Sequence, residues 1–265
     1  MRKPLFKISS IAIIICIFGT ILFELWSFPI FLDEKKNFYF FKILSLGFGF
    51  LTTLFLLHRE NSKLFQRPTK ILFLIPAFLI AIDNFQWAAF FSGKMKLGDV
   101  DFWDVTLFLF YCLFTGLFEE SIFRGIVFPL LAVRFEKTVK GLWKTVVASS
   151  LIFGGMHIFN VFSSGGYAIL QAGYSVLTGG LFAFVLIKTK NILLCALTHG
   201  IYNFCGMLYS SDVGIGMGAV IDLPTALTML VVCLILGSFV LYSMYRYTEE
   251  ERMELYKRLG FGIEE

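Results

Sequence analysis

The sequence predicts an all-α, polytopic membrane helix bundle of about eight transmembrane helices, with both termini in the cytoplasm. Its 265 residues are 57% apolar and only 16% charged, and they include 33 phenylalanines, which is far from the composition of a soluble domain. Windows of about 20 mainly apolar residues, the length that crosses a bilayer as a helix, recur along the chain. No shift in composition marks a second domain, so residues 1–265 are expected to form a single membrane domain.

Eight windows meet this length criterion. The first follows a basic N-terminus, as in a signal peptide, but its apolar run continues to Leu32 without a small-x-small cleavage site, so we expect a retained span. The fifth and sixth windows are joined by the short turn Ser163–Gly166. The eight windows cover residues 8–28, 38–57, 71–91, 103–131, 143–162, 166–187, 191–209 and 224–245.

Lysine and arginine concentrate in every second gap between these windows. The intervening gaps are short or carry acids that match or outnumber the bases, as between Lys94 and Asp104. By the positive-inside rule the basic gaps and both termini face the cytoplasm, and an even number of spans agrees with this orientation. The basic gaps hold Arg2, Lys3 and Lys7; Arg59, Lys63, Arg67 and Lys70; Arg134, Lys137, Lys140 and Lys144; Lys188 and Lys190; and Arg246.

The remaining composition adds little chemistry. The net charge of +4 reports topology and headgroup contact, and no nucleic-acid motif is present. All five cysteines lie in apolar runs without a Cys-x-x-Cys pair, which is typical of small buried side chains. Residues 248–265 mix Met253, Leu255 and Tyr256 with acids and bases, so we expect a cytoplasmic amphipathic tail that forms a short surface helix.

Two adjacent carboxylates and a guanidinium lie inside the fourth window, at Glu119, Glu120 and Arg124. A charge at the centre of a membrane helix costs roughly 3 kcal/mol on insertion scales, so such groups usually face the bundle interior and mark function. Glu120 and Arg124 are at i and i+4, the favourable order for an ion pair on one helix face. Glu119 lies about 100° away around the helix axis, which leaves its carboxylate available for chemistry.

Two histidines lie at membrane depth in later windows. His157 follows Phe153 by four residues, and His199 precedes Asn203 by four, so each pair shares a helix face. Counted from the cytoplasmic ends at about 1.5 Å per residue, Glu119, His157 and His199 lie about 22, 20 and 12 Å deep, respectively. With helix tilt these groups can converge on one wet cavity.

The third window carries two further polar residues, Asp83 and Asn84. Both lie about 20 Å deep by the same count, so Asp83 is a candidate for lining the cavity or for a structural hydrogen bond. Pro129 is expected to end or bend the fourth helix.

The motifs Glu119-Glu120-x-x-x-Arg124, Phe153-x-x-x-His157 and His199-x-x-x-Asn203, in this order on separate membrane helices, resemble those of the CPBP family. This is the CAAX-protease and bacteriocin-processing group of intramembrane peptidases, also called the Abi family, which includes the Rce1-type enzymes. The match covers residues 103–209, the expected catalytic core, and eight spans are similar to the Rce1-type architecture.

The resemblance implies a glutamate-dependent endopeptidase that works without a metal or other cofactor, with its site open to the cytoplasm. It implies that Glu119 activates water with help from His157, and that His199 and Asn203 stabilise the oxyanion. Glu120 and Arg124 would support the site, with Phe153 and Asp83 as candidate cavity-lining residues. No serine or cysteine accompanies the histidines at a convincing spacing, so attack by water is preferred.

Two other interpretations remain open from the residues. Glu119, His157 and His199 could hold zinc as a two-histidine, one-carboxylate site, although no His-Glu-x-x-His motif is present. The polar cluster could instead be structural, in a bacteriocin-immunity factor, scaffold or transporter component. For a protease, the expected partners are the lipid bilayer and a membrane-associated, prenylated or leader-bearing peptide or protein. The expected location is a bacterial or archaeal cell membrane.

Overall fold

The computed structural model describes residues 30, 32–97, 99–160, 167–209, 214–217 and 223–261. The first predicted span, residues 8–28, and the turn Ser163–Gly166 lie outside these residues. The described chain is almost entirely helical, as the composition predicts. A two-residue antiparallel pair joins Lys96 to Met217 and Leu97 to Gly216.

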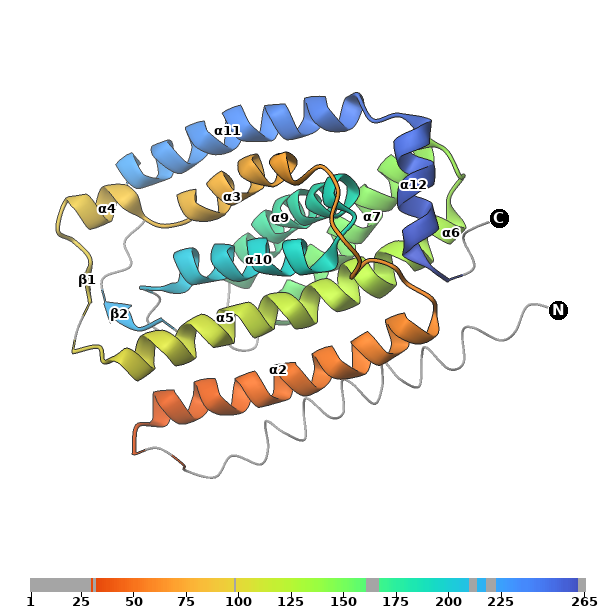
Figure 1. The fold of residues 1–265 in the computed structure, drawn as a ribbon. Helices are drawn as coiled ribbons and strands as arrows, with labels where there is room; N and C mark the ends of the chain where they lie inside the picture. The colour runs from red at the N-terminus through yellow and green to blue at the C-terminus, as the bar shows by residue number, and fades with distance from the viewer. Residues whose placement is uncertain are drawn as a thin grey trace. The chain divides into compact units, whose positions relative to one another are not determined.

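The elements follow one another along the chain in the order drawn in Figure 1. They are α2 (Glu34–Arg59), η1 (Ile71–Phe73), α3 (Leu74–Asp83), α4 (Trp87–Phe91), β1 (Lys96–Leu97), α5 (Phe102–Ile122), the π-helical turn η2 (Phe123–Val127), α6 (Phe128–Arg134), α7 (Val139–Met156), η3 (His157–Asn160), α9 (Tyr167–Thr189), α10 (Ile192–Met207), β2 (Gly216–Met217), α11 (Leu223–Tyr245) and α12 (Glu249–Leu259).

Five described segments are long and apolar enough to cross a membrane, and two shorter apolar helices accompany them. The five cover Glu34–Arg59, Phe102–Arg134, Val139–Asn160, Gln171–Thr189 and Leu227–Tyr245, and the shorter ones cover Ile71–Asp83 and Ile192–Met207. The chain is therefore multi-spanning. The count of eight and the cytoplasmic position of both termini stay predictions.

The third predicted span is not one continuous helix. α3 ends at Asp83, and α4 begins only at Trp87, so the expected 71–91 helix is interrupted. The polar residues Asn84 and Gln86 fall in the break, and the Asn84 amide donates to the carbonyl of Tyr202 on another helix. This contact of the Asn84 side chain with another helix favours an end of α3 here, although the apolar window alone predicts a continuous helix.

Pro129 does not end the fourth helix, contrary to one of the two outcomes expected for it. The helical path continues through η2 and α6 to Arg134, with Pro129 in the first turn of α6. Proline removes one backbone donor, and a π turn directly before it changes the local hydrogen-bond register. This turn contains Arg124.

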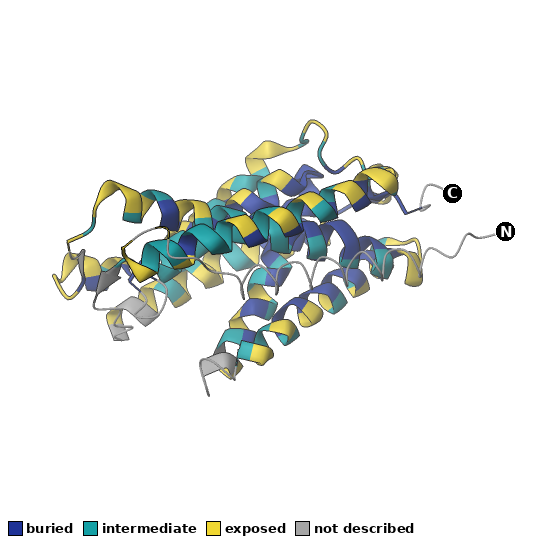
Figure 2. Cartoon of the chain, turned by 90° about the horizontal axis from the view of Figure 1, so that it is seen from below, coloured by how far each residue is buried: buried dark blue, intermediate teal, exposed yellow. Residues whose placement is uncertain are grey.

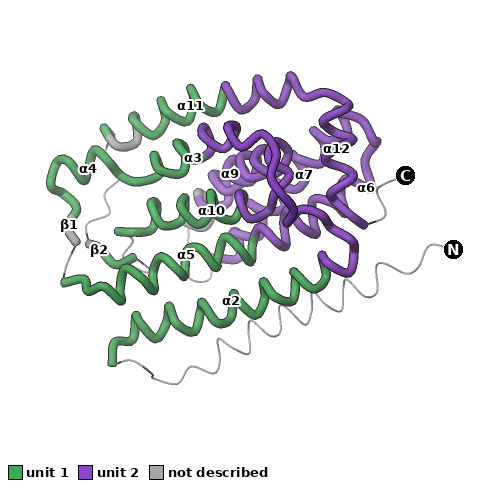
Figure 3. Tube along the Cα trace, in the orientation of Figure 1, with its two compact units in different colours: residues 1–56, 78–119, 196–238 green, residues 57–77, 120–195, 239–265 purple. Residues whose placement is uncertain are grey.

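Close contacts within the chain divide it into two units, coloured in Figure 3. Unit 1 comprises residues 1–56, 78–119 and 196–238, and unit 2 comprises residues 57–77, 120–195 and 239–265. Each unit is therefore assembled from segments distant in sequence. The division of α5 falls between Glu119 and Glu120.

Unit 1 has an aromatic core where α2 and α5 meet. The Tyr39 ring is fully buried and stacks on Tyr111 with centroids 5.7 Å apart, and Phe108 packs on Phe204 of α10 at 5.4 Å. Exposed residues alternate with less exposed ones along the long helices (Figure 2). Many of the exposed ones are large and apolar, such as Ile235 at 65%, which is expected of surfaces that face lipid.

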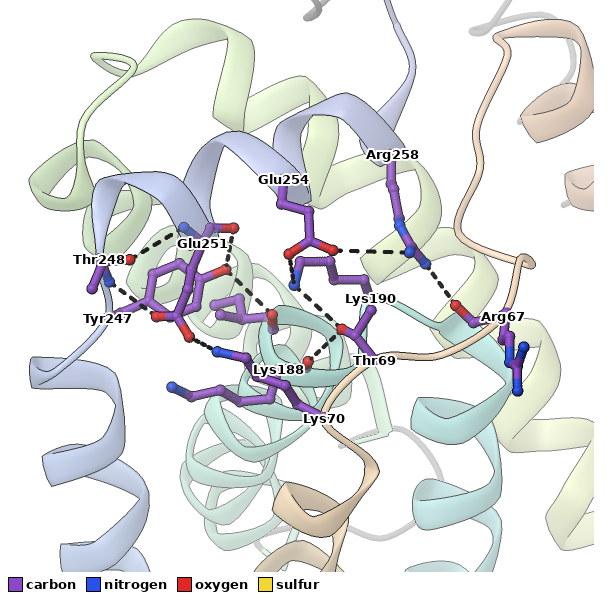
Figure 4. A network of polar contacts seen from close by, with 11 residues as sticks. Arg67, Thr69, Lys70, Lys188, Lys190, Tyr247, Thr248, Glu251, Glu254 and Arg258 are labelled. Carbon is purple, nitrogen blue, oxygen red and sulfur yellow. Dashed lines mark hydrogen bonds and ion pairs between the residues drawn. The ribbon is translucent and has the colours of Figure 1, made fainter.

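Unit 2 includes the C-terminal helix α12, whose contacts are drawn in Figure 4. Its apolar residues Leu255 and Leu259 are fully buried, so this face packs on protein. Acidic side chains beside them pair with bases of the preceding loops: Glu251 with Lys70, and Glu254 with Lys190 at 3.0 Å. Through these two ion pairs α12 contacts both the Thr69 loop and the turn that leads into α10. The loop and the turn also contact each other directly, because the Thr69 amide donates to the Thr189 carbonyl at 2.8 Å.

Candidate active site

A backbone-to-backbone crossing of α5 and α10 positions the polar residues of unit 1. A Cβ on Gly116 would lie 2.4 Å from the carbonyl oxygen of Ala196 and 3.0 Å from the amide nitrogen of Gly200. A Cβ on Gly200 would in turn lie 3.0 Å from the Cα of Leu113. Only glycine permits so close a crossing, as is common where membrane helices pack.

This crossing brings Glu119 and His199 together. Gly116 lies three residues before Glu119, and Gly200 follows His199 directly. The His199 Nε2 atom is 3.8 Å from the Glu119 Oε2 atom, with the two side chains 5% and 25% exposed. The predicted convergence of these two residues is therefore present within unit 1.

The separation between the two groups is too long for a direct hydrogen bond. The buried Glu119 Oε2 atom has no hydrogen-bond partner among the described residues. Because leaving a buried carboxylate oxygen unpaired is costly, this atom is suited to a polar group of a reacting molecule, such as water.

Asn203 lies on α10 one turn after His199 and is half-buried. The preceding carbonyl, that of Tyr202, accepts a hydrogen bond from the Asn84 side chain at 2.9 Å. Asp83 is half-buried at the end of α3. Asn84, of the two polar residues of this segment, is thus the one that contacts the helix of His199 and Asn203.

Unit 2 contains the supporting pair. The predicted Glu120–Arg124 ion pair is confirmed, with Arg124 Nε 3.1 Å from Glu120 Oε2 and both side chains fully buried. The Arg124 Nη2 atom donates to the carbonyl of Gly179 on α9 at 2.7 Å. Its guanidinium lies over the rings of Phe153 and Phe182, 4.7 and 5.5 Å from their centroids. Arg124 therefore ties its own helix to α7 and α9.

Phe153 adjoins this arginine, and His157 in turn contacts Phe153. Phe153, a candidate cavity-lining residue from the sequence, is only 1% exposed and packs edge-on against Phe123 and Phe182. Its carbonyl lies 2.9 Å from the Nδ1 atom of His157. A carbonyl can only accept, so Nδ1 carries a proton and donates to it, and in the neutral tautomer Nε2 keeps its lone pair. Phe153 thus acts through packing and through its backbone oxygen.

The structure accordingly presents the predicted residues in two sets. Glu119, His199 and Asn203 belong to unit 1, while Glu120, Arg124, Phe153 and His157 belong to unit 2. The convergence of His157 with Glu119 stays a prediction. Within the described part of each unit, no three His, Cys, Asp or Glu side chains are grouped to hold a metal ion.

Sequence reasoning did not identify the glycines of the α5–α10 crossing. Gly116 and Gly200 look unremarkable in an apolar chain with 23 glycines. The one signal in the sequence that could have identified them is their position, since each lies within one helical turn of a polar residue of a predicted span. The contact between Asn84 and α10 was also beyond sequence reasoning, because it joins residues 118 positions apart.

Residues 101–205 match the family model described as "Type II CAAX prenyl endopeptidase Rce1-like". No curated protein and no solved structure matches the chain. The matched segment contains all three motifs, from Glu119 to Asn203. The match supports a CAAX-protease assignment for this segment and leaves bacteriocin processing without support.

Proposed function

We propose that this integral membrane protein is a glutamate-dependent intramembrane endopeptidase, because residues 101–205 match the Rce1-like family model of type II CAAX prenyl endopeptidases. The observation that carries the proposal is the Glu119–His199 pair. A carboxylate oxygen that has no hydrogen-bond partner among the residues the structure describes lies 3.8 Å from an imidazole nitrogen at a glycine-mediated helix crossing.

Glu119 acts as the general base in this proposal. Its unpartnered oxygen accepts a proton from a water molecule, and the resulting hydroxide attacks the scissile carbonyl carbon. The protonated carboxyl group then gives this proton to the leaving amine, so that the peptide bond breaks and the carboxylate is regenerated. The neighbouring carboxylate, that of Glu120, is neutralised by Arg124 and takes no part in this proton transfer.

His199 and Asn203 stabilise the negative charge that develops on the carbonyl oxygen. Both lie on one face of α10, and His199 is next to the proposed base. Hydrogen-bond donors held in place before the reaction stabilise a tetrahedral oxyanion by several kcal/mol, because they need no reorganisation. The rigid α5–α10 crossing supports this role, since it fixes the helix that carries both donors.

His157 assists the base. This role is the one that the family resemblance implies; within unit 2 the His157 Nδ1–H group donates to the Phe153 carbonyl, which in the neutral ring leaves the Nε2 lone pair to accept a hydrogen bond. Glu120 and Arg124 maintain unit 2 around this histidine, because Arg124 stacks on the Phe153 ring that precedes it by four residues.

The substrate class follows from the family description: a protein or peptide that ends in a prenylated CAAX sequence. Such a substrate is anchored in the bilayer, which agrees with a catalytic carboxylate on a membrane helix. The basic gaps of the sequence favour a site open to the cytoplasm, where prenylated C-termini are exposed.

The test is cleavage of a farnesylated CAAX peptide by purified protein in proteoliposomes. Glu119→Gln should lower kcat at least about 100-fold, because the amide cannot accept the proton. The matched control is Glu136→Gln, which removes a carboxylate that is 60% exposed and pairs with Lys144, and which should leave kcat unchanged. Full activity of Glu119→Gln would refute the assignment of the base.

The same preparation tests the proposed metal-free mechanism. Metal analysis of the purified protein should detect no bound zinc. Incubation with a zinc chelator should leave cleavage of the peptide unaffected. Loss of activity with the chelator, restored by added zinc, would instead support the zinc-dependent alternative. If the wild-type protein cleaves no prenylated peptide and the Glu119→Gln variant keeps its biological effect in cells, a binding or immunity role would replace the enzymatic one.

A further inference from the structure

Asn84 makes a contact that neither the motifs nor the family match assigns. It follows α3 directly and donates from Nδ2 to the carbonyl oxygen of Tyr202 at 2.9 Å. This carbonyl belongs to the peptide group that joins Tyr202 to Asn203. The side chain of Asn84 therefore holds the backbone directly beside a proposed oxyanion donor.

α10 provides space for this contact at Gly206. A Cβ at that position would lie 2.0 Å from Asn84 Nδ2 and 2.9 Å from Cγ, so any larger residue would displace the amide. Gly206 is also four residues after Tyr202, where its own amide is expected to donate to the same carbonyl within the helix. The Asn84 amide and the α10 backbone thus converge on one acceptor.

The position of this contact along α10 matters. The helix ends at Met207, only four residues after Asn203, and the ends of helices fray. Nearer the middle of α10, the close contact with α5 at Gly116 and Gly200 holds the helix beside His199. The packing of Phe204 on Phe108 holds this end of the helix as well, and the hydrogen bond at Tyr202 adds a directional attachment next to Asn203.

We propose that Asn84 is a positioning residue for the oxyanion-binding pair, and that it acts by anchoring the Tyr202–Asn203 peptide group. The inference rests on the proposed protease function. Asn84 itself touches no reacting atom in this proposal. Its loss should therefore lower kcat while leaving KM for the peptide nearly unchanged, because the oxyanion exists only in the transition state.

The first test replaces Asn84 with alanine and with aspartate. Asn84→Ala should lower kcat about tenfold, which is less than the loss on deleting an oxyanion donor outright. Asn84→Asp preserves the shape but can donate to the Tyr202 carbonyl only when protonated. The ratio of its kcat to that of wild type should therefore rise as the pH is lowered, whereas the ratio for Asn84→Ala should stay flat.

A double variant separates anchoring from simple filling of space. If Asn84 only fills a gap beside Gly206, then Gly206→Ala should fill that gap in the Asn84→Ala background and restore kcat. If Asn84 anchors the backbone, the double variant should stay as slow as Asn84→Ala. Gly206→Ala alone should be similarly slow, because its Cβ expels the amide.

Asn37→Ala is the matched control, since it removes an amide of unit 1 whose Oδ1 accepts from the backbone of Ile30. It should keep wild-type kcat. Wild-type kcat in Asn84→Ala, or full restoration in the double variant, would overturn the positioning role. Neither result would affect the proposed function, which Glu119→Gln tests separately.

Discussion

Replacing Gly116 with alanine should disable the proposed enzyme without removing any polar group. The new Cβ would lie 2.4 Å from the Ala196 carbonyl oxygen, whereas ordinary contacts of a Cβ begin at 3.4 Å. The obstacle is backbone, so no side-chain rotation relieves it. α5 and α10 must therefore separate by about 1 Å at this crossing, because close-packed helices cannot otherwise absorb the methyl group.

The consequence for chemistry follows from the position of the crossing. Gly116 lies one turn before Glu119, and Ala196 lies one turn before His199, so the separation is transmitted to the two side chains now 3.8 Å apart. A displacement of about 1 Å between reacting groups can cost about 100-fold in rate. We expect kcat for the farnesylated peptide to fall by about that factor.

Gly237→Ala in α11 is the control, since a Cβ there would meet nothing within 4 Å. Both variants add the same methyl group to a helix, where alanine is favoured over glycine by about 1 kcal/mol. The assay compares kcat in proteoliposomes after thermal unfolding has shown that both variants are folded. If Gly116→Ala retained the kcat of Gly237→Ala, the crossing would not be what positions the Glu119–His199 pair.

Two further predictions concern unit 2. Arg124→Ala should lower the free energy of unfolding by about 3–5 kcal/mol, because it removes the guanidinium that pairs with the fully buried Glu120 carboxylate. Thermal unfolding in detergent should show part of this loss recovered when Glu120→Gln is added, and equal midpoints for the single and double variants would contradict the pairing. At α12, burial opposes ionisation of Glu251, but hydrogen bonds from Lys70 and the Thr248 amide still lower its pKa. Because the pKa of Glu251 is lower in the folded protein, its carboxylate stabilises α12 at pH values above the ordinary pKa of 4.5, and this stabilisation is lost as the pH falls through the folded pKa. Hydrogen exchange in α12, corrected for intrinsic rates, should therefore accelerate in acid. Glu251→Gln should not show this acceleration, and a parallel rise in that variant would refute the assignment.

The helical class and most of the spans followed from composition and window length. Lipid requires every backbone polar group to be satisfied within a segment, so a 20-residue apolar run has few alternatives to a helix. The break after Asp83 did not follow, because the Asn84 amide that accompanies it has its partner on α10. The fourth helix also continues through Pro129, with a π turn directly before it that no residue pattern predicted.

For the candidate site, sequence alone separated the roles of the adjacent carboxylates. Spacing along one helix determines that Glu120 faces Arg124, and the pair is present as expected. The neighbour of Glu119 could not be deduced this way. It depends on Gly116 of α5 and Gly200 of α10, which are 84 positions apart in the sequence. The two helix backbones approach there to a distance that only residues without side chains allow.

Sequence by itself thus determined that this is a helical membrane protein with carboxylates, imidazoles and an amide at depth, because the cost of burying charge in lipid makes such residues conspicuous. Only the tertiary structure decided which of them meet. It placed Glu119 beside His199, enclosed Arg124 between two rings and attached Asn84 to α10. The physical reason is that helix crossings are set by the shapes of surfaces brought together from distant parts of the chain, and a linear pattern does not encode them.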